Sequence, residues 1–131
     1  MTEIEPGLTG EVVRVVSEDI TAHAMGSGGV KVLGTPAMLM LMEQAALTAV
    51  EAALGEGQTT VGTRLDVQHL AATPIGMRVT ARARLVAVDG RKLTYEVEAE
   101  DEREPIGRGH HERFVVDKAR FLERVADKAE P

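Results

Sequence analysis

The sequence predicts one α+β domain over residues 1–131, in which an antiparallel five-stranded sheet wraps around one long central helix. Three observations predict this arrangement. One segment has the length and apolar character of a buried helix, the segments after it alternate apolar and polar residues, and turn signals separate them. Alternation with one polar face is typical of an antiparallel sheet that packs on one side and meets water on the other.

The central helix is predicted to run from Thr35 to Leu54. Thr35 is a favourable N-cap residue, Pro36 suits the first helical position, and Gly55 suits the C-terminal end. The polar residues within the segment are Glu43, Gln44, Thr48 and Glu51. Because nearly all of its surface is apolar, we expect other parts of the protein to cover this helix on most sides.

The sheet is predicted from five segments rich in β-branched or alternating residues. In chain order they are 11–16, 59–70, 77–88, 91–100 and 106–116. Residues 19–25 are ambiguous, with a helical turn as one interpretation, and Gly26–Gly29 is a flexible loop. A short amphipathic helix follows Asp117. One apolar helix lying on one face of such a sheet is the hot-dog arrangement.

Alternation also predicts which side chains of the sheet face the helix. The inward set comprises Val79, Ala81, Ala83, Leu85 and Ala87 on one strand and Leu93, Tyr95, Val97 and Ala99 on the next. Asp89-Gly90 is a strong signal for the hairpin that joins these two strands. On the outer face, Arg82 and Arg84 are expected to pair across strands with acidic residues of the 91–100 segment.

Composition excludes several classes of function. A net charge of −6 argues against a nucleic-acid surface, and no apolar run is long enough to span a membrane. The chain has no cysteine, which removes disulfides, thiol nucleophiles and cysteine-bound zinc and suits a reducing cytoplasm. We therefore expect a cytoplasmic protein without a cofactor.

Glu43 is the first candidate for chemistry. Its neighbours three and four residues away along the helix are all apolar, so no cation on the same helix compensates its charge. Burial without a partner favours the neutral form of a carboxyl group, as a general acid or base near neutrality requires. The alternative is a glutamate at the margin of the polar stripe.

Thr35 and His69 are the other candidates. Capping alone explains Thr35, although a helix N-terminus also brings N–H groups towards a developing oxyanion. His69 ends an alternating strand before a tight turn, where an edge histidine and a catalytic one are both plausible. The adjacent His110 and His111 point to opposite faces of a strand, so we assign no metal.

Several motifs resemble one known family. They are Gly34-Thr35 followed by Leu41-Met42-Glu43, Val61-Gly62-Thr63, the segment His69–Gly76, Asp89-Gly90-Arg91, and Ile106–Arg113. With these motifs the chain resembles the fluoroacetyl-CoA thioesterase family of the hot-dog superfamily from about residue 11 to residue 121. The resemblance implies that Thr35, Glu43 and His69 correspond to the family's catalytic residues and that Gly62 lies next to the substrate pocket.

The resemblance also implies a homodimer in which two sheets join edge to edge and the active sites lie at the subunit interface. Association of dimers into a tetramer stays open. One departure concerns residues 25–30, which hold no aromatic residue where the fluoroacetyl-CoA enzyme has a phenylalanine-bearing lid. We therefore expect a general short-chain acyl-CoA as substrate, without selectivity for the fluorinated one.

The leading hypothesis is hydrolysis of an acyl-CoA thioester. Glu43 attacks the carbonyl or deprotonates water, His69 acts as acid and base, and Thr35 hydrogen-bonds Glu43 or the substrate. Backbone N–H groups near Gly34–Thr35 or Gly62 stabilise the oxyanion. Basic side chains such as Arg64 or Arg113 are expected to meet the coenzyme A phosphates.

Two other functions use the same fold. One is a non-catalytic module that binds an acyl-CoA or small acid in the same pocket without acid–base chemistry. The other is a dehydratase of 3-hydroxyacyl thioesters. That subgroup usually pairs its histidine with an aspartate-containing loop before the helix, and here that loop is rich in glycine and lacks aspartate.

Overall fold

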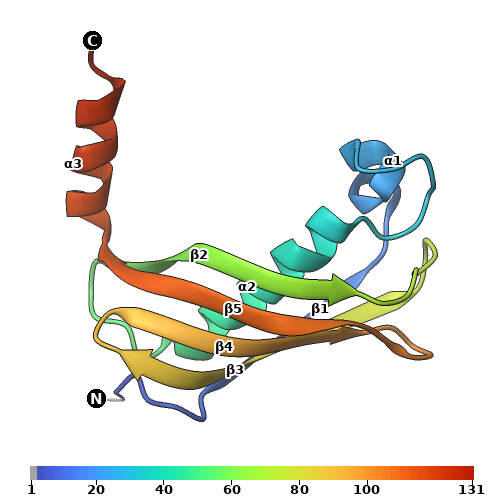
Figure 1. Ribbon diagram of the computed structural model, residues 1–131, viewed down its shortest axis with the longest axis horizontal. Coiled ribbons are helices and arrows are strands. Elements are labelled where there is room, and N and C mark those ends of the chain that lie inside the picture. Colours follow the sequence, from blue (N-terminus) through green and yellow to red (C-terminus); the bar gives the residue numbers. More distant parts are fainter. Residues whose placement is uncertain (1–2) are drawn as a thin grey trace.

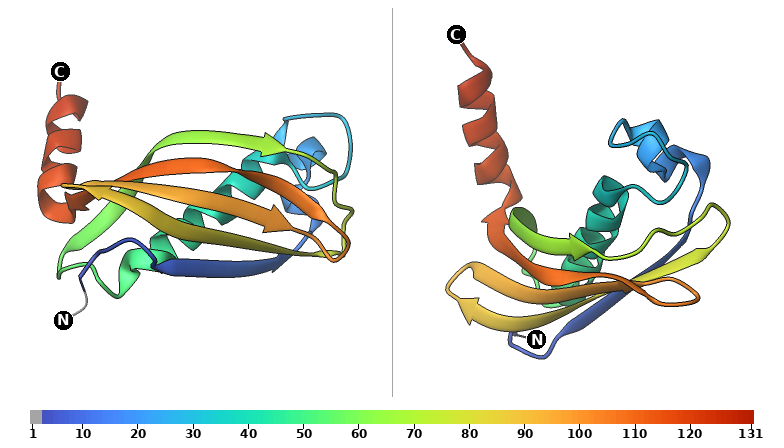
Figure 2. Two further views of the ribbon diagram at one scale, coloured as in Figure 1. Left: turned by 60° about the horizontal axis from the view of Figure 1, so that its bottom comes forward. Right: turned by 45° about the vertical axis from the view of Figure 1, so that its right-hand side comes forward.

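A computed structural model describes residues 3–131 and confirms the hot-dog fold. The five antiparallel strands are β1 (Thr9–Val15), β2 (Gln58–His69), β3 (Arg78–Asp89), β4 (Lys92–Glu100) and β5 (Pro105–Asp117). They lie in the order β1-β3-β4-β5-β2, so β1 and β2 are the two edges of the sheet. The curled sheet wraps around α2 (Thr35–Glu51), as the ribbon views show (Figures 1 and 2).

Helix α2 forms the centre of the core, as its apolar surface predicts. Its buried residues are Ala37, Met38, Leu41, Met42, Ala45, Ala46, Ala49 and Val50. Alanines at 45 and 49 and a glycine at 10 let β1 lie directly on the helix. A Cβ at Gly10 would overlap the Ala45 carbonyl and lie 2.6 Å from the amide nitrogen of Ala49.

The start of α2 differs from the sequence prediction. Gly34 is the N-cap residue, Thr35 is the first helical residue, and no side chain caps the helix. The interpretation of Thr35 as a capping residue is therefore wrong, and its hydroxyl is free for another partner. The helix also ends at Glu51 rather than Leu54, followed by turns that lead into β2.

The predicted alternation is confirmed in β4 and in most of β3. Leu93, Tyr95, Val97 and Ala99 are all buried against the helix, as are Val79, Ala81, Ala83 and Leu85. Ala87 is exposed, contrary to prediction, because an irregularity between Leu85 and Ala87 shifts the β3–β4 register. On the outer face, Arg82 binds Glu100 at 2.7 Å and Arg84 binds Glu96 at 2.8 Å, which confirms the predicted cross-strand pairing.

Two segments rise from opposite ends of the sheet on the β2 side. Before α2 lie a 3-10 turn (Glu18–Ile20) and the short helix α1 (Ala22–Met25), so residues 19–25 are largely helical. After β5, α3 (Lys118–Ala129) stands away from the sheet (Figure 1). No helix within residues 3–131 has the length and apolar character to cross a membrane.

Candidate functional site

Thr35 and His69 meet where the start of α2 reaches the end of β2. Thr35 Oγ1 lies 2.8 Å from His69 Nδ1, a hydrogen-bond distance. The contact depends on Thr35 being inside the first turn of the helix, because a capping threonine would turn its hydroxyl towards the helix's own N–H groups. The fold therefore joins two of the three predicted catalytic residues.

The other ring nitrogen of His69, Nε2, is buried and has no hydrogen-bond partner within residues 3–131. Burial lowers the pKa of the His69 imidazole, and a hydrogen bond with the Ala71 backbone offsets part of that effect. The ring is therefore neutral near neutral pH. A buried nitrogen without a partner marks a position where a substrate or a water molecule can exchange a proton with the ring.

Glu43 has a partner that its own helix does not supply. Arg113 on β5 donates from Nη1 to Glu43 Oε2 at 3.1 Å. The Arg113 side chain is only 7% exposed, whereas that of Glu43 is 40% exposed, so the carboxylate remains accessible. The expectation of an uncompensated charge is wrong, because a strand distant in sequence supplies the cation.

Arg113 is fixed by a network of its own. Its Nε donates to Thr60 Oγ1 and its Nη2 to the Thr60 carbonyl, both at 2.8 Å. Its Nη1 also lies 3.2 Å from His111 Nε2, while His111 Nδ1 lies 2.7 Å from the Arg64 carbonyl. Burial is the largest cause that lowers the pKa of His111, which favours the neutral ring that can accept from the guanidinium. The network holds Glu43 in one position.

Gly62 makes room for the Glu43 carboxylate beside β2. A Cβ at this position would collide with Glu43 Oε2 and approach His111 Cε1 to 3.3 Å. An irregularity in the pairing of β2 with β5 follows directly, between Gly62 and Arg64. The structure thus places Gly62 against Glu43, a contact that the sequence did not predict, since Gly62 was linked to the substrate pocket and to the oxyanion.

Glu43 does not reach the Thr35–His69 pair within one chain. Thr35 and Glu43 are eight residues apart on α2, which is about 12 Å at 1.5 Å per residue. Along β2, Gly62 and His69 are separated by roughly 23 Å at 3.3 Å per residue. Each chain therefore carries two half-sites along one edge strand, Thr35–His69 at one end and Glu43–Arg113 towards the other.

The remaining predicted site residues differ in their availability. Arg64 is 66% exposed and near Glu112 at 4.0 Å, so its guanidinium is open to solvent. Arg113 is buried and committed to Thr60, His111 and Glu43, so the expected contact with coenzyme A phosphates does not fit its position. The Gly34 N–H, which the sequence placed near the oxyanion, donates to the Ile20 carbonyl at 2.9 Å. The absence of a side chain at Gly34 lets α1 pack closely, because a Cβ there would lie 3.1 Å from the Ala22 nitrogen.

Sequence reasoning missed Thr60, His111 and Arg113 as a group around Glu43. A signal was present in the last strand. Ile106 and Val115 are apolar residues of β5 that face the helix. Because side chains alternate between the two faces of a strand, His111 and Arg113 lie on the same face as Val115. Polar residues at inward positions of an alternating strand require partners in the core, and Glu43 was the unpaired acid there.

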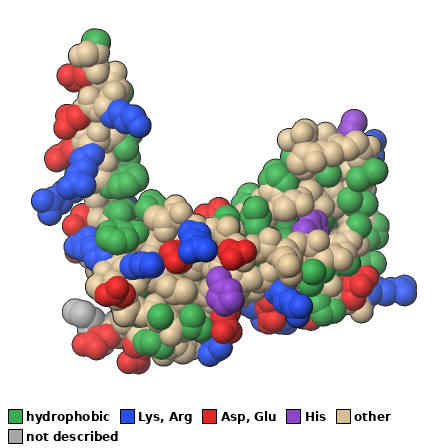
Figure 3. All heavy atoms as spheres, viewed as in Figure 1, with side chains coloured by type: hydrophobic (Ala, Val, Ile, Leu, Met, Phe, Trp, Pro, Cys, Tyr) green, Lys and Arg blue, Asp and Glu red, His purple; other side chains and the backbone are tan. Residues whose placement is uncertain are grey.

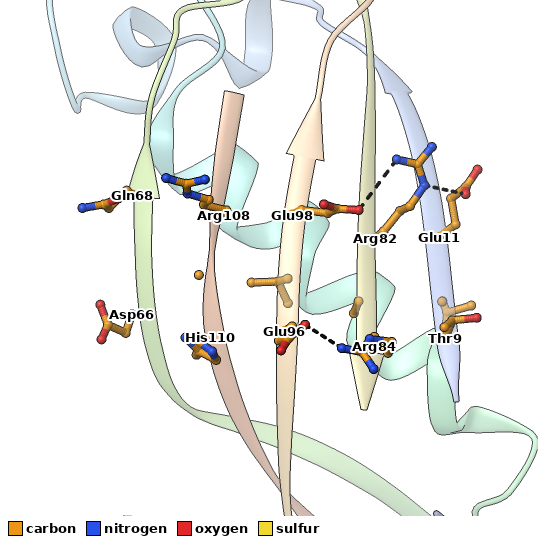
Figure 4. Close-up of a pocket in the computed structure, with 15 residues that line it drawn as sticks. Thr9, Glu11, Asp66, Gln68, Arg82, Arg84, Glu96, Glu98, Arg108 and His110 are labelled. Atoms are coloured by element: carbon orange, nitrogen blue, oxygen red, sulfur yellow. Dashed lines mark hydrogen bonds and ion pairs between the residues drawn. The ribbon is translucent and has the colours of Figure 1, made fainter. Parts of the chain in front are cut away.

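A large hollow lies elsewhere, on the outer face of the sheet. Figure 4 shows it lined by polar and charged side chains that include Arg82, Glu98 and His110. Cross-strand ion pairs already neutralise much of this charge, and none of Thr35, Glu43 and His69 lines the hollow. We place no site there. Within residues 3–131, no cluster of three or more histidine, aspartate or glutamate side chains is arranged to hold a metal.

Comparison with known proteins gives the family. The model of the fluoroacetyl-CoA-specific thioesterase family matches residues 16–119. The chain belongs to this family. The fluoroacetyl-CoA thioesterase of Streptantibioticus cattleyicolor is 41% identical over 98 residues, which cover 75% of this chain and 70% of that protein.

Solved structures agree with this family assignment. A solved structure of a fluoroacetyl-CoA thioesterase superposes with a TM-score of 0.92 at 32% identity, and the match covers 98% of this chain and all of that one. A hot-dog-like protein from Thermanaerovibrio acidaminovorans has a TM-score of 0.87 at 27% identity, covering 96% and 93% of the two chains. The thioesterase family matched here thus has the same fold over nearly its full length.

Proposed function

We propose that the protein hydrolyses short-chain acyl-CoA thioesters at a composite site, in which Glu43 of one copy acts with Thr35 and His69 of a second copy. One observation carries the proposal. The two half-sites lie along the same free edge strand, β2, and are too far apart to cooperate within one chain. Membership of a thioesterase family supplies the reaction class.

Antiparallel pairing of two β2 strands completes the site. An unpaired edge strand is a template for pairing with another chain, and a two-fold axis makes each end of β2 meet the opposite end of its partner. With the axis near the middle of β2, the Gly62 end of one copy faces the His69 end of the other. One dimer then contains two equivalent sites.

Each residue has a defined role in this site. Glu43 attacks the thioester carbonyl carbon, or takes a proton from the water that attacks it. Thr35 orients His69 through Nδ1, and Nε2 of the neutral ring accepts the proton that the water loses and passes it to the thiolate sulfur released when the C–S bond breaks. The Thr35 N–H in the first turn of α2 has no acceptor in its own helix, so it is placed to stabilise the oxyanion. The products are a carboxylic acid and free coenzyme A.

The substrate is proposed as a class. The related enzymes are named for fluoroacetyl-CoA. Residues 25–30 of this chain are Met-Gly-Ser-Gly-Gly-Val, with no aromatic side chain to select a fluorinated acyl group. We therefore assign short-chain acyl-CoAs in general as substrates. Arg64 is the residue proposed to contact the coenzyme A phosphates. The proposed location is the cytoplasm.

Mixed dimers test the composite site. Glu43→Gln and His69→Asn chains are each expected to lose thiol release from acetyl-CoA. After unfolding and refolding together in equal amounts, half of the dimers are mixed, and each mixed dimer has one intact site. Activity should then return to about a quarter of that of the wild type. Two inactive variants that stay inactive when mixed, although both form dimers, would contradict a shared site.

The two roles of Glu43 are separable. In a single turnover in ¹⁸O-water, attack by the carboxylate places the label in Glu43, since water opens the mixed anhydride at either carbonyl. General-base catalysis places label only in the released acid. A wild-type dimer that releases no thiol from any short acyl-CoA would contradict hydrolysis and favour a ligand-binding module.

A further inference from the structure

Helix α3 has an apolar face that the rest of the described chain, residues 3–117, leaves exposed. Every residue of Lys118–Ala129 is exposed, and Phe121, Leu122 and Val125 remain 39%, 61% and 51% accessible. These three residues share one side of the helix. An isolated helix of 12 residues is marginally stable in water, so α3 needs a surface on which to bury this face.

A second exposed apolar patch lies at the opposite end of β2. In the segment of residues 22–33, Met25 is 40% exposed and Val30 is 59% exposed. Figure 3 shows α3 and this segment as two projections with a hollow between them, and hydrophobic side chains of α3 face the hollow. In Figure 1 the edge strand β2 runs from the base of one projection to the base of the other.

The direction of β2 determines what occupies the hollow. β2 starts at the α3 end, where Gln58 pairs with Asp117, and finishes at the α1 end with His69. A second copy that pairs its β2 antiparallel to this one therefore brings its residues 22–33 beside α3 and its α3 beside residues 22–33. The same two-fold axis covers both patches, twice in each dimer.

We propose that the apolar face of α3 docks on residues 22–33 of the second copy and holds that segment in place over the composite site. This inference rests on the β2-paired dimer of the proposed function. The segment leads directly into the helix that carries Thr35, and Gly34 packs against its Ala22 and Met25. Docking of Phe121, Leu122 and Val125 thus fixes the entrance to the site from the partner side.

Cross-linking tests the contact directly, because the chain has no native cysteine. Leu122→Cys and Val30→Cys chains are combined so that dimers with one chain of each variant form, and these dimers are treated with a short bismaleimide. A covalent dimer is expected from the mixture, whereas neither variant alone should form one. The two positions lie at opposite ends of a strand about 40 Å long, so a short linker does not join them within one chain.

Glu123→Cys is the matched control, since it lies on the opposite side of α3. Mixed with Val30→Cys, it should form no covalent dimer. Equal cross-linking of Glu123→Cys and Leu122→Cys, or none from Leu122→Cys, would overturn the docking.

A second measurement separates this inference from the proposed function. Phe121→Asp should weaken the dimer at least tenfold in sedimentation and raise amide hydrogen exchange in residues 22–33, while Glu123→Gln changes neither. If mixed dimers recover activity but Phe121→Asp leaves exchange in residues 22–33 unchanged, α3 docking is wrong and the composite site stands. If the wild type is a monomer, both proposals fail.

Discussion

Arg113 and Glu43 illustrate how single residues in this protein depend on contacts across the fold. The pair joins α2 to β5 over 70 positions of sequence, and the guanidinium also contacts Thr60 and His111. A buried arginine with this many partners positions a carboxylate more firmly than a surface ion pair does. We infer that Arg113 is a positioning residue for Glu43 and makes no contact with the substrate.

Arg113→Met should lower kcat for acetyl-CoA at least about tenfold, because Glu43 loses the group that orients it. The unfolding free energy should fall by about 2 kcal/mol, since His111 and Thr60 lose a buried donor. Thiol release and urea unfolding measure the two effects. Arg108→Met, an exposed arginine on the same strand, is the control and should change neither. A kcat unchanged in Arg113→Met would refute the positioning role.

Gly62→Ala should reduce activity without unfolding the protein. The added Cβ would meet the end of the flexible Glu43 side chain, which moves aside and leaves its position beside Arg113. Gly55→Ala is a matched control, because its Cβ would also meet the end of a flexible side chain, Gln58 Oε1 at 3.0 Å, away from the site. Steady-state kinetics with thermal unfolding compares the two. Equal activity of both variants would contradict this placement of Glu43.

At the scale of elements, the two edge strands of the sheet differ in what they contact. β1 packs against α2, whereas β2 leaves one edge open. The helix and β1 approach so closely that Gly10 faces helix backbone, which leaves no space for a side chain. β2 is paired on one side only, so its other edge is open to a second chain. The first contact stabilises the protomer, and the second is the surface on which we propose that dimers form.

Gly10→Ala should destabilise the fold by about 2–3 kcal/mol, because the rigid helix backbone cannot move aside as a side chain does. Denaturant unfolding measures this loss. The neighbouring Thr9 is exposed on the outer face of β1, so Thr9→Ala should stay within about 0.5 kcal/mol of the wild type. Equal stability of the two variants would show that β1 and the helix are less closely packed.

At the scale of the whole molecule, buried titratable groups make stability depend on pH. Burial lowers the pKa values of His69 and His111 below the ordinary 6.5. As the pH falls below 6.5, the unfolded chain binds protons before the folded one does, so the unfolding free energy decreases. His69→Asn should flatten this acid slope in urea titrations. An equal slope in the wild type and in His69→Asn would contradict the burial of this ring.

Tyr95 makes the unfolding free energy depend on pH in the alkaline range. Burial raises its pKa from 10.0 to about 12, despite the opposing effect of Arg113. Above pH 10 the unfolded chain loses the phenol proton first, so stability decreases as the pH rises towards 12. Tyr95 is the single tyrosine, so tyrosinate absorbance reports on this residue alone. The absorbance should appear near pH 12 in the folded protein and near pH 10 in urea; coincident curves would contradict the prediction.

The sequence by itself determined the order and type of the elements. The change from helical to alternating periodicity, Asp89-Gly90 and the Gly34–Pro36 start of α2 are local signals, and the structure differs by a few residues at their ends. Burial of Ala87 was predicted wrongly, because the pairing of β3 with β4 becomes irregular between Leu85 and Ala87 and the end of β3 is exposed after it. Thr35, Glu43 and His69 were also chosen from local setting and resemblance alone.

Only the tertiary structure decided how those residues are joined. The Thr35 hydroxyl does not cap the helix but hydrogen-bonds His69, 34 positions away, and Glu43 pairs with Arg113 of the last strand. The structure also shows that the two pairs are separated along β2, which supports the shared site that the resemblance implies and that we propose. Such pairings depend on strand order, register and the close approach of backbones. These are set by the packing of the whole chain, and no short segment of sequence contains that information.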